Sequence, residues 1–170
     1  LATGLYSHQN KVTGNNPANT PENLAHAKRT AKDPKELIIS NIDKHGCLPH
    51  WLGKKGYVSH QSGKWWEGPY QRGGFTEGMT RGYPNPGGRH GDDGLKIGRE
   101  GMEPVFDFID QSVKQEKPFF VWYAPFLPHT PHNPPERLHK QYLAKGVQSR
   151  VAQYYALCEW FDETCGVLIN

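Results

Sequence analysis

The chain has 170 residues, which is enough for one domain with its own core, and it carries a formal net charge of +3. Because the basic residues are dispersed along the chain, a nucleic-acid-binding protein is not favoured, and no apolar run approaches the length of a membrane span. The hydrophobic fraction is only 35%, whereas Gly (19) and Pro (14) are abundant, so we expect a modest core with long, structured loops.

The first part of the chain predicts mostly short elements separated by turns. Composition and periodicity indicate, in order, a loop at Thr13–Pro21, a polar helix at 22–32, an apolar cluster at 37–39 that is either strand or helix, a helix at 48–55, and an alternating strand at 57–62. Residues 69–98 form a long stretch rich in Gly and Pro. Its aromatic and charged content favours an ordered loop near a site over a linker.

The second part predicts helices around one strongly apolar strand. Residues 99–116 form an amphipathic helix, with Met102, Val105, Phe106, Ile109 and Val113 at helical spacing. The run Phe119–Ala124 lacks charge and predicts a central strand that is covered on both faces. A short helix at 134–144 and a long helix at 147–169 follow. The apolar stripe of the long helix comprises Val151, Tyr154, Tyr155, Cys158, Phe161, Cys165 and Leu168.

The order of these elements indicates an α/β layer with too few strands to complete its own sheet. We therefore expect the chain to be a fragment of a longer protein. The three cysteines show no paired framework, and Cys47 is expected to be a small buried residue and not a nucleophile.

Lys64 is the first candidate functional residue. It follows the strand 57–62 through Gly63, so its ammonium group can reach the carboxyl edge of a parallel sheet, where ligands bind. A lysine there suits an anionic oxygen of a sulfate, phosphate or carboxylate. The alternative is a solvated lysine at a strand end.

His129 is the second candidate. The apolar strand leads directly into a Pro-rich loop, and prolines on both sides of His129-Thr130 restrict its backbone. The histidine is expected to donate a hydrogen bond or transfer a proton beside the group that Lys64 binds. The alternative is a loop histidine that caps a turn.

Other residues are candidates for contact with a substrate. Trp66 offers a stacking platform for a sugar or an aryl group, whereas Trp65 is expected in the core. Arg89 and His90 lie in the glycine-rich stretch, where they could contact a polar substrate. The spacing of histidines and aspartates in 90–93 and 129–132 matches no metal signature, so no metal ligand is assigned.

Four blocks, taken together and in this order, resemble the sulfatases of the alkaline phosphatase superfamily. Residues 1–9 resemble the end of the sulfatase signature, 56–65 its GY…GKW block, 117–131 its KPFF…PHxP block, and 154–166 the helix before its second metal segment. The resemblance implies part of a three-layer α/β sandwich with a mostly parallel sheet, incomplete in this chain. It also implies that residues 1–170 are a fragment of a single catalytic domain.

The resemblance implies roles for both candidate catalytic residues. Lys64 matches the lysine that binds the sulfate oxygens, and His129 matches the histidine that contacts sulfate and assists the leaving group. The family usually has a histidine at the position of Trp66. That departure leaves His129 alone, or His90 from the long loop, to protonate the leaving oxygen.

The family also implies cofactors and a substrate class. Sulfatases use calcium and a formylglycine, but this chain contains no matched ligand for the metal, and the formylglycine precursor would lie upstream of Leu1. The fragment alone is therefore expected to be inactive. In the full-length protein the expected reaction is hydrolysis of a sulfated small molecule or glycan, in the periplasm or outside the cell.

Two other functions stay open at this stage. The full-length protein could be a phosphate or phosphonate monoester hydrolase of the same superfamily, which a comparison of aryl sulfate with aryl phosphate would reveal. It could instead be a catalytically dead carbohydrate-binding relative, and Trp66 in place of histidine is the feature that supports this alternative.

Overall fold

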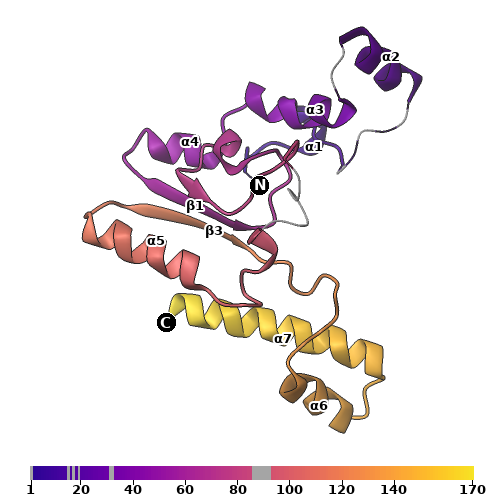
Figure 1. Cartoon of the computed structure of the whole chain (residues 1–170), viewed down its shortest axis with the longest axis vertical. Helices are drawn as coiled ribbons and strands as arrows, with labels where there is room; N and C mark the ends of the chain where they lie inside the picture. The colour runs from indigo at the N-terminus through magenta and orange to yellow at the C-terminus, as the bar shows by residue number, and fades with distance from the viewer. Residues whose placement is uncertain (1, 15, 17, 19, 31–32, 86–92) are drawn as a thin grey trace.

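A computed structural model describes the chain except for residues 1, 15, 17, 19, 31–32 and 86–92. The α-helices are α1 (Ser7–Asn10), α2 (Pro21–Thr30), α3 (Pro34–Ile39), α4 (Leu48–Gly53), α5 (Glu103–Lys114), α6 (Glu136–Ala144) and α7 (Ser149–Ile169) (Figure 1). The strands are β1 (Val58–Gly63), β2 (Glu77–Gly78) and β3 (Phe119–Ala124). Short 3₁₀ turns η1 (Ser40–Lys44), η2 (Tyr70–Gly73) and η3 (Asp93–Leu95) connect them. No helix in these described ranges is long and apolar enough to cross a membrane.

The three strands are parallel and lie in the order β2-β1-β3. β1 is thus the middle strand, and all its residues after Val58 are buried, so the predicted alternation of 57–62 is wrong. The prediction that Phe119–Ala124 is central is also wrong, since β3 is a half-buried strand at the edge of this sheet. The apolar character of β3 reflects rings that pack on both faces of the sheet and does not indicate its place in the strand order.

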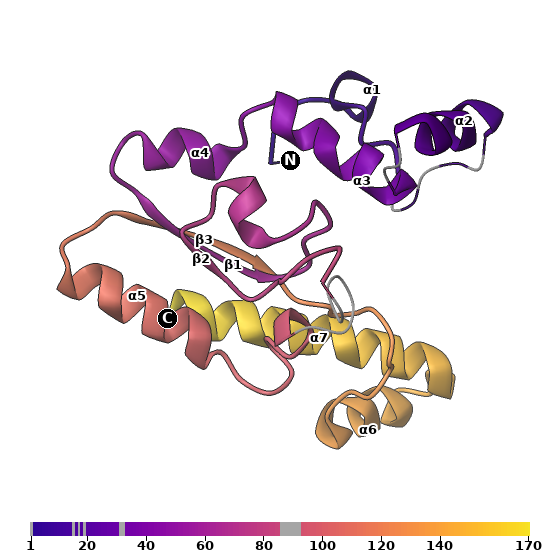
Figure 2. The ribbon, with the colours of Figure 1, turned by 45° about the horizontal axis from the view of Figure 1, so that its top comes forward.

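Helices cover both faces of the sheet (Figure 2). On the side of α3 and α4, Phe120 and Trp122 of β3 pack against a cluster around Trp65 and Phe75. On the side of α5 and α7, the alternate residues of β3 pack against a second cluster of Ile97, Met102 and Val105. The expected α/β fold with a parallel sheet is therefore confirmed, and Trp65 belongs to the core as predicted, with 3% of its surface exposed.

Helix faces differ from the predicted ones where other helices pack closely. In α7 the aromatic stripe is exposed at Tyr154 and Tyr155, and the buried residues are Ala152, Ala156, Leu157 and Thr164. Small alanines allow close helix packing, and α7 lies against α6 over this part of its length (Figure 1). In α5 the predicted core residue Val113 is exposed, and Phe108 is buried instead.

The stretch 69–98 is only in part a loop. It contains η2, β2 and η3, and β2 pairs with β1 through His60 opposite Glu77 and Gln61 opposite Gly78. A strand of two residues has no periodicity that a sequence pattern can reveal. The helix predicted from residue 99 begins at Glu103, with Pro104 in its first turn.

Candidate active site at the carboxyl end of the sheet

The carboxyl ends of β1 and β3 are held together by an unusually close contact. Gly63 is paired with Ala124, and it adopts a φ of 79°, which is a left-handed conformation that favours glycine. A β-carbon at this position would lie 2.0 Å from the carbonyl oxygen of Ala124. The next residue, Lys64, donates its backbone N–H to that same oxygen at 2.5 Å. Only glycine therefore allows β1 to deliver Lys64 beside the end of β3.

A buried polar network fixes this strand end from the other side. The Gly63 carbonyl accepts hydrogen bonds from Gln61 Nε2 at 2.9 Å and from Thr80 Oγ1 at 3.0 Å. The Thr80 backbone N–H donates in turn to Gln61 Oε1 at 2.9 Å, and both side chains are fully buried. Because each polar group in the network is satisfied, the network holds the backbone before Lys64 in one conformation.

The Lys64 ammonium group lies among aromatic rings. Its Nζ is 5.0 Å from the centre of the Trp66 ring and 5.7 Å from the centre of the Phe126 ring. Within the described part of the chain, no carboxylate forms an ion pair with it. Aromatic faces attract a cation without neutralising its charge. The positive charge of Lys64 thus stays available to an anion.

His129 and Lys64 line the same cavity, which has a volume of about 500 Å³. The His129 ring packs edge-on against Phe126, with ring centres 5.5 Å apart. Its Nδ1 lies 3.0 Å from the carbonyl oxygen of Thr130 and 3.1 Å from the Thr130 hydroxyl, so it can donate to the carbonyl or accept from the hydroxyl, depending on the tautomer. Both contacts hold the Nδ1 edge of the ring against Thr130. The sequence-derived roles of the two residues stay predictions, and the structure places both at one cavity.

Arg99 positions the loop that carries His129, and the sequence analysis missed it. Its guanidinium group donates to the backbone carbonyls of Phe126 at 3.2 Å, His129 at 2.8 Å and Pro131 at 3.3 Å, and to the side chain of Asn133. Partial burial lowers the pKa of the guanidinium below its ordinary value. No sequence signal could have paired an arginine near α5 with a loop about thirty residues away.

The predicted substrate-contact residues Trp66, Arg89 and His90 do not all lie in the described part of the chain. Trp66 is half-buried beside Lys64 but is not among the residues that line the cavity, and its role as a stacking platform stays a prediction. Arg89 and His90 lie outside the described residues. His132 and Tyr154 also line the cavity, and their ring centres are 6.2 Å apart.

The cofactors implied by the resemblance do not fit the described residues. No group of three or more His, Cys, Asp or Glu side chains in the described ranges could hold a metal ion. The residues that line the cavity of Lys64 and His129 include no Cys or Ser, one of which is needed to form a formylglycine. The chemistry below is therefore derived from Lys64 and His129 alone.

The fold and the site define an α/β protein with its candidate site at the carboxyl edge of a parallel sheet. The family model for sulfatases matches residues 1–170, so the chain belongs to the sulfatase family. A search of curated proteins found no match.

Among solved structures, the chain is similar to Ps i-CgsB, crystallised in complex with k-i-k-neocarrahexaose. The TM-score is 0.55 at 18% sequence identity, and the match covers 74% of this chain and 36% of that chain. The fold is therefore part of the alkaline-phosphatase-like α/β fold, and this chain corresponds to about a third of the solved protein.

Proposed function

We propose that the full-length protein hydrolyses a sulfate ester. The observation that carries the proposal is the shared cavity, where a lysine with no carboxylate partner in the described ranges and an exposed imidazole line one space at the carboxyl end of the sheet. Membership of the sulfatase family supports this reaction over other reactions of anionic substrates.

In this proposal Lys64 binds the non-bridging oxygens of the sulfate group. Its positive charge offsets the negative charge of the transferring group, and the neighbouring Trp66 and Phe126 rings do not neutralise that charge. His129 hydrogen-bonds the sulfate or the bridging oxygen. When its ring is protonated, Nε2 can donate the proton that the departing alcohol requires.

The proposed substrate class is a sulfated glycan. The cavity combines a cation with the rings of Phe126, His129, His132 and Tyr154. Aromatic faces stack against the apolar faces of sugar rings, and imidazoles can bond sugar hydroxyls. The similar protein Ps i-CgsB was solved with a neocarrahexaose, which agrees with a carbohydrate substrate.

The experiment replaces Lys64 with alanine in the full-length protein and follows hydrolysis of an aryl sulfate. We expect turnover to fall at least about a hundredfold, the scale of losing one preorganised charge contact. Lys54→Ala is the matched control, because Lys54 is also exposed and lies over an aromatic ring, that of Trp51, at 4.2 Å. Near-normal turnover by Lys64→Ala would refute the role of Lys64.

The same assay separates the alternative functions. A preference for aryl phosphate over aryl sulfate would indicate a phosphomonoester hydrolase that uses the same lysine. Binding of sulfated oligosaccharide without turnover of either ester would indicate a carbohydrate-binding relative, the reading that Trp66 in the family's histidine position supports.

A further inference from the structure

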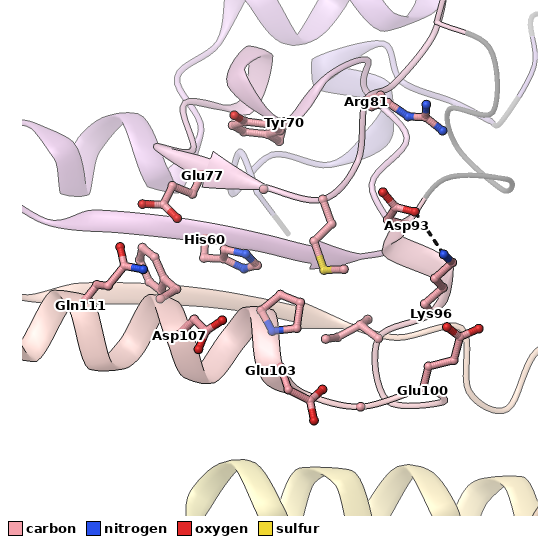
Figure 3. A pocket seen from close by; sticks show the side chains of 16 residues that line it. His60, Tyr70, Glu77, Arg81, Asp93, Lys96, Glu100, Glu103, Asp107 and Gln111 are labelled. Atoms are coloured by element: carbon pink, nitrogen blue, oxygen red, sulfur yellow. Dashed lines mark ion pairs between the residues drawn. The ribbon is translucent and has the colours of Figure 1, made fainter.

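A second and larger cavity lies on the α5 side of the sheet, with a volume of about 890 Å³ (Figure 3). Its walls come from β1, η2, β2, η3, the loop that follows η3, and α5 as far as Gln111. It shares no lining residue with the cavity of Lys64 and His129. Its volume is within the range of small-molecule sites.

Among the described residues, the lining of this cavity is acidic, with five carboxylates against two cations. Lys96 pairs with Asp93 at 3.4 Å, which leaves Arg81 as the other basic side chain of the described lining. The side chains of the other four carboxylates form no ion pair or hydrogen bond with any described residue: Glu77, Glu100, Glu103 and Asp107. An anion such as a sulfated glycan would therefore be repelled from this cavity.

His60 gives a second and independent sign of a ligand. Its side chain comes from the middle of β1 and is turned toward the cavity (Figure 3), yet only 4% of its surface is exposed. The ring packs against Phe108 with centres 5.2 Å apart, and its Nδ1 is buried without a hydrogen-bond partner among the described residues. A buried polar atom without a partner destabilises a protein, so a ligand that hydrogen-bonds this imidazole would stabilise it.

The positions of the acidic groups indicate the shape of the ligand. Glu77 reaches the cavity from β2, Glu103 and Asp107 lie one turn apart on α5, and Glu100 lies beyond the start of that helix (Figure 3). The carboxylates are thus distributed along the cavity. They do not converge, and the described ranges hold no cluster of three metal-ligating side chains, which argues against a metal ion.

We propose that this cavity binds an aliphatic polyammonium ion of the polyamine class. Its separated ammonium groups would each meet a carboxylate, and its methylene segments would lie over the apolar side chains of Met79 and Ile97. The imidazole of His60, kept neutral because burial lowers its pKa, would accept a hydrogen bond from an ammonium N–H.

The test is calorimetric titration of spermidine into the full-length protein at low salt. We expect saturable binding that weakens about tenfold in each of Asp107→Asn and Glu103→Gln, the scale of one hydrogen bond to a charged group. Asp110→Asn is the matched control, since Asp110 is exposed on the same helix but does not line the cavity, and it should leave binding unchanged.

Three results would overturn the proposal. The first is an absence of saturable spermidine binding, and the second is an equal loss of spermidine affinity in Asp110→Asn and Asp107→Asn. The third is saturable binding of magnesium ions that spermidine does not compete away. All three variants change exposed helical residues, so folding is expected to persist. The measurement does not depend on sulfatase activity, and failure of one proposal leaves the other intact.

Discussion

Replacement of Gly63 by alanine tests how the strand end positions Lys64. Two separate penalties act at this residue. Its φ of 79° lies in the left-handed region, where an L-residue with a side chain costs about 1 kcal/mol. In addition, the new β-carbon would lie 2.0 Å from the Ala124 carbonyl oxygen and 2.8 Å from the Pro125 nitrogen.

The second penalty is the larger one. Ordinary contacts of a β-carbon begin near 3.4 Å, so the ends of β1 and β3 must separate to admit the methyl group. The hydrogen bond from Lys64 N–H to Ala124 would be lost, at about 1 kcal/mol. Displacing the buried Gly63 carbonyl from Gln61 and Thr80 costs about 1–3 kcal/mol more. We expect Gly63→Ala to lower the free energy of unfolding by about 3–5 kcal/mol.

Urea denaturation of three variants separates the two penalties. Gly56 also has a positive φ, of 84°, but a β-carbon there meets no atom within 4 Å, so Gly56→Ala should cost about 1 kcal/mol. Gly53→Ala, in the open end of α4, should change stability by less than about 1 kcal/mol. If Gly63→Ala destabilises the protein no more than Gly56→Ala does, the argument from the strand end is refuted.

Further predictions concern three side chains. Arg99→Lys keeps the charge but replaces at most one or two of the four guanidinium hydrogen bonds. We expect faster amide hydrogen exchange in residues 127–133 and a decrease of about 2 kcal/mol in the free energy of unfolding. Unchanged exchange would contradict the role of Arg99 in holding the His129 loop. Burial raises the pKa of Cys47 to about 11, so the native thiol should react with iodoacetamide only after unfolding, and fast alkylation of the native protein would show that it is accessible. Burial lowers the pKa of His60 in the folded protein. As the pH falls below about 6.5, the unfolded chain therefore binds a proton at His60 more readily than the folded protein does, and the free energy of unfolding decreases. His60→Phe should flatten this part of the profile of unfolding free energy against pH, and an unaltered profile would exclude His60 as its source.

Local patterns were sufficient to predict the place of Lys64. The strand pattern and the glycine that ends it, Gly63, occupy only a few consecutive residues. The position of Lys64 follows directly from where that strand ends. The same holds for the proline-bounded loop of His129. Both residues were therefore placed at the carboxyl end of the sheet from the sequence, and the structure brings them to one cavity.

Contacts between distant segments were beyond such patterns. The bonds of Arg99 to the His129 loop, the pairing of β2 with β1, and the burial of Ala152 instead of Tyr154 each depend on a neighbour remote in sequence. The apolar run of β3 predicted a strand correctly but not its place in the sheet, because its side chains pack against apolar clusters on both faces while the strand stays half-buried at the edge.

The pairing of β1 with β3 has a consequence for how this protein can vary. Gly63 is paired with Ala124, the last residue of β3. The backbone therefore leaves β1 and β3 at two points that are about 4.8 Å apart, the spacing of neighbouring strands. Loops between Lys64 and the start of β3 can therefore gain or lose residues without altering the backbone separation from which Lys64 and the His129 loop diverge, provided that Thr80 and Arg99 keep their places. Substrate preference can change in that intervening segment while the backbone geometry beneath the candidate site is conserved.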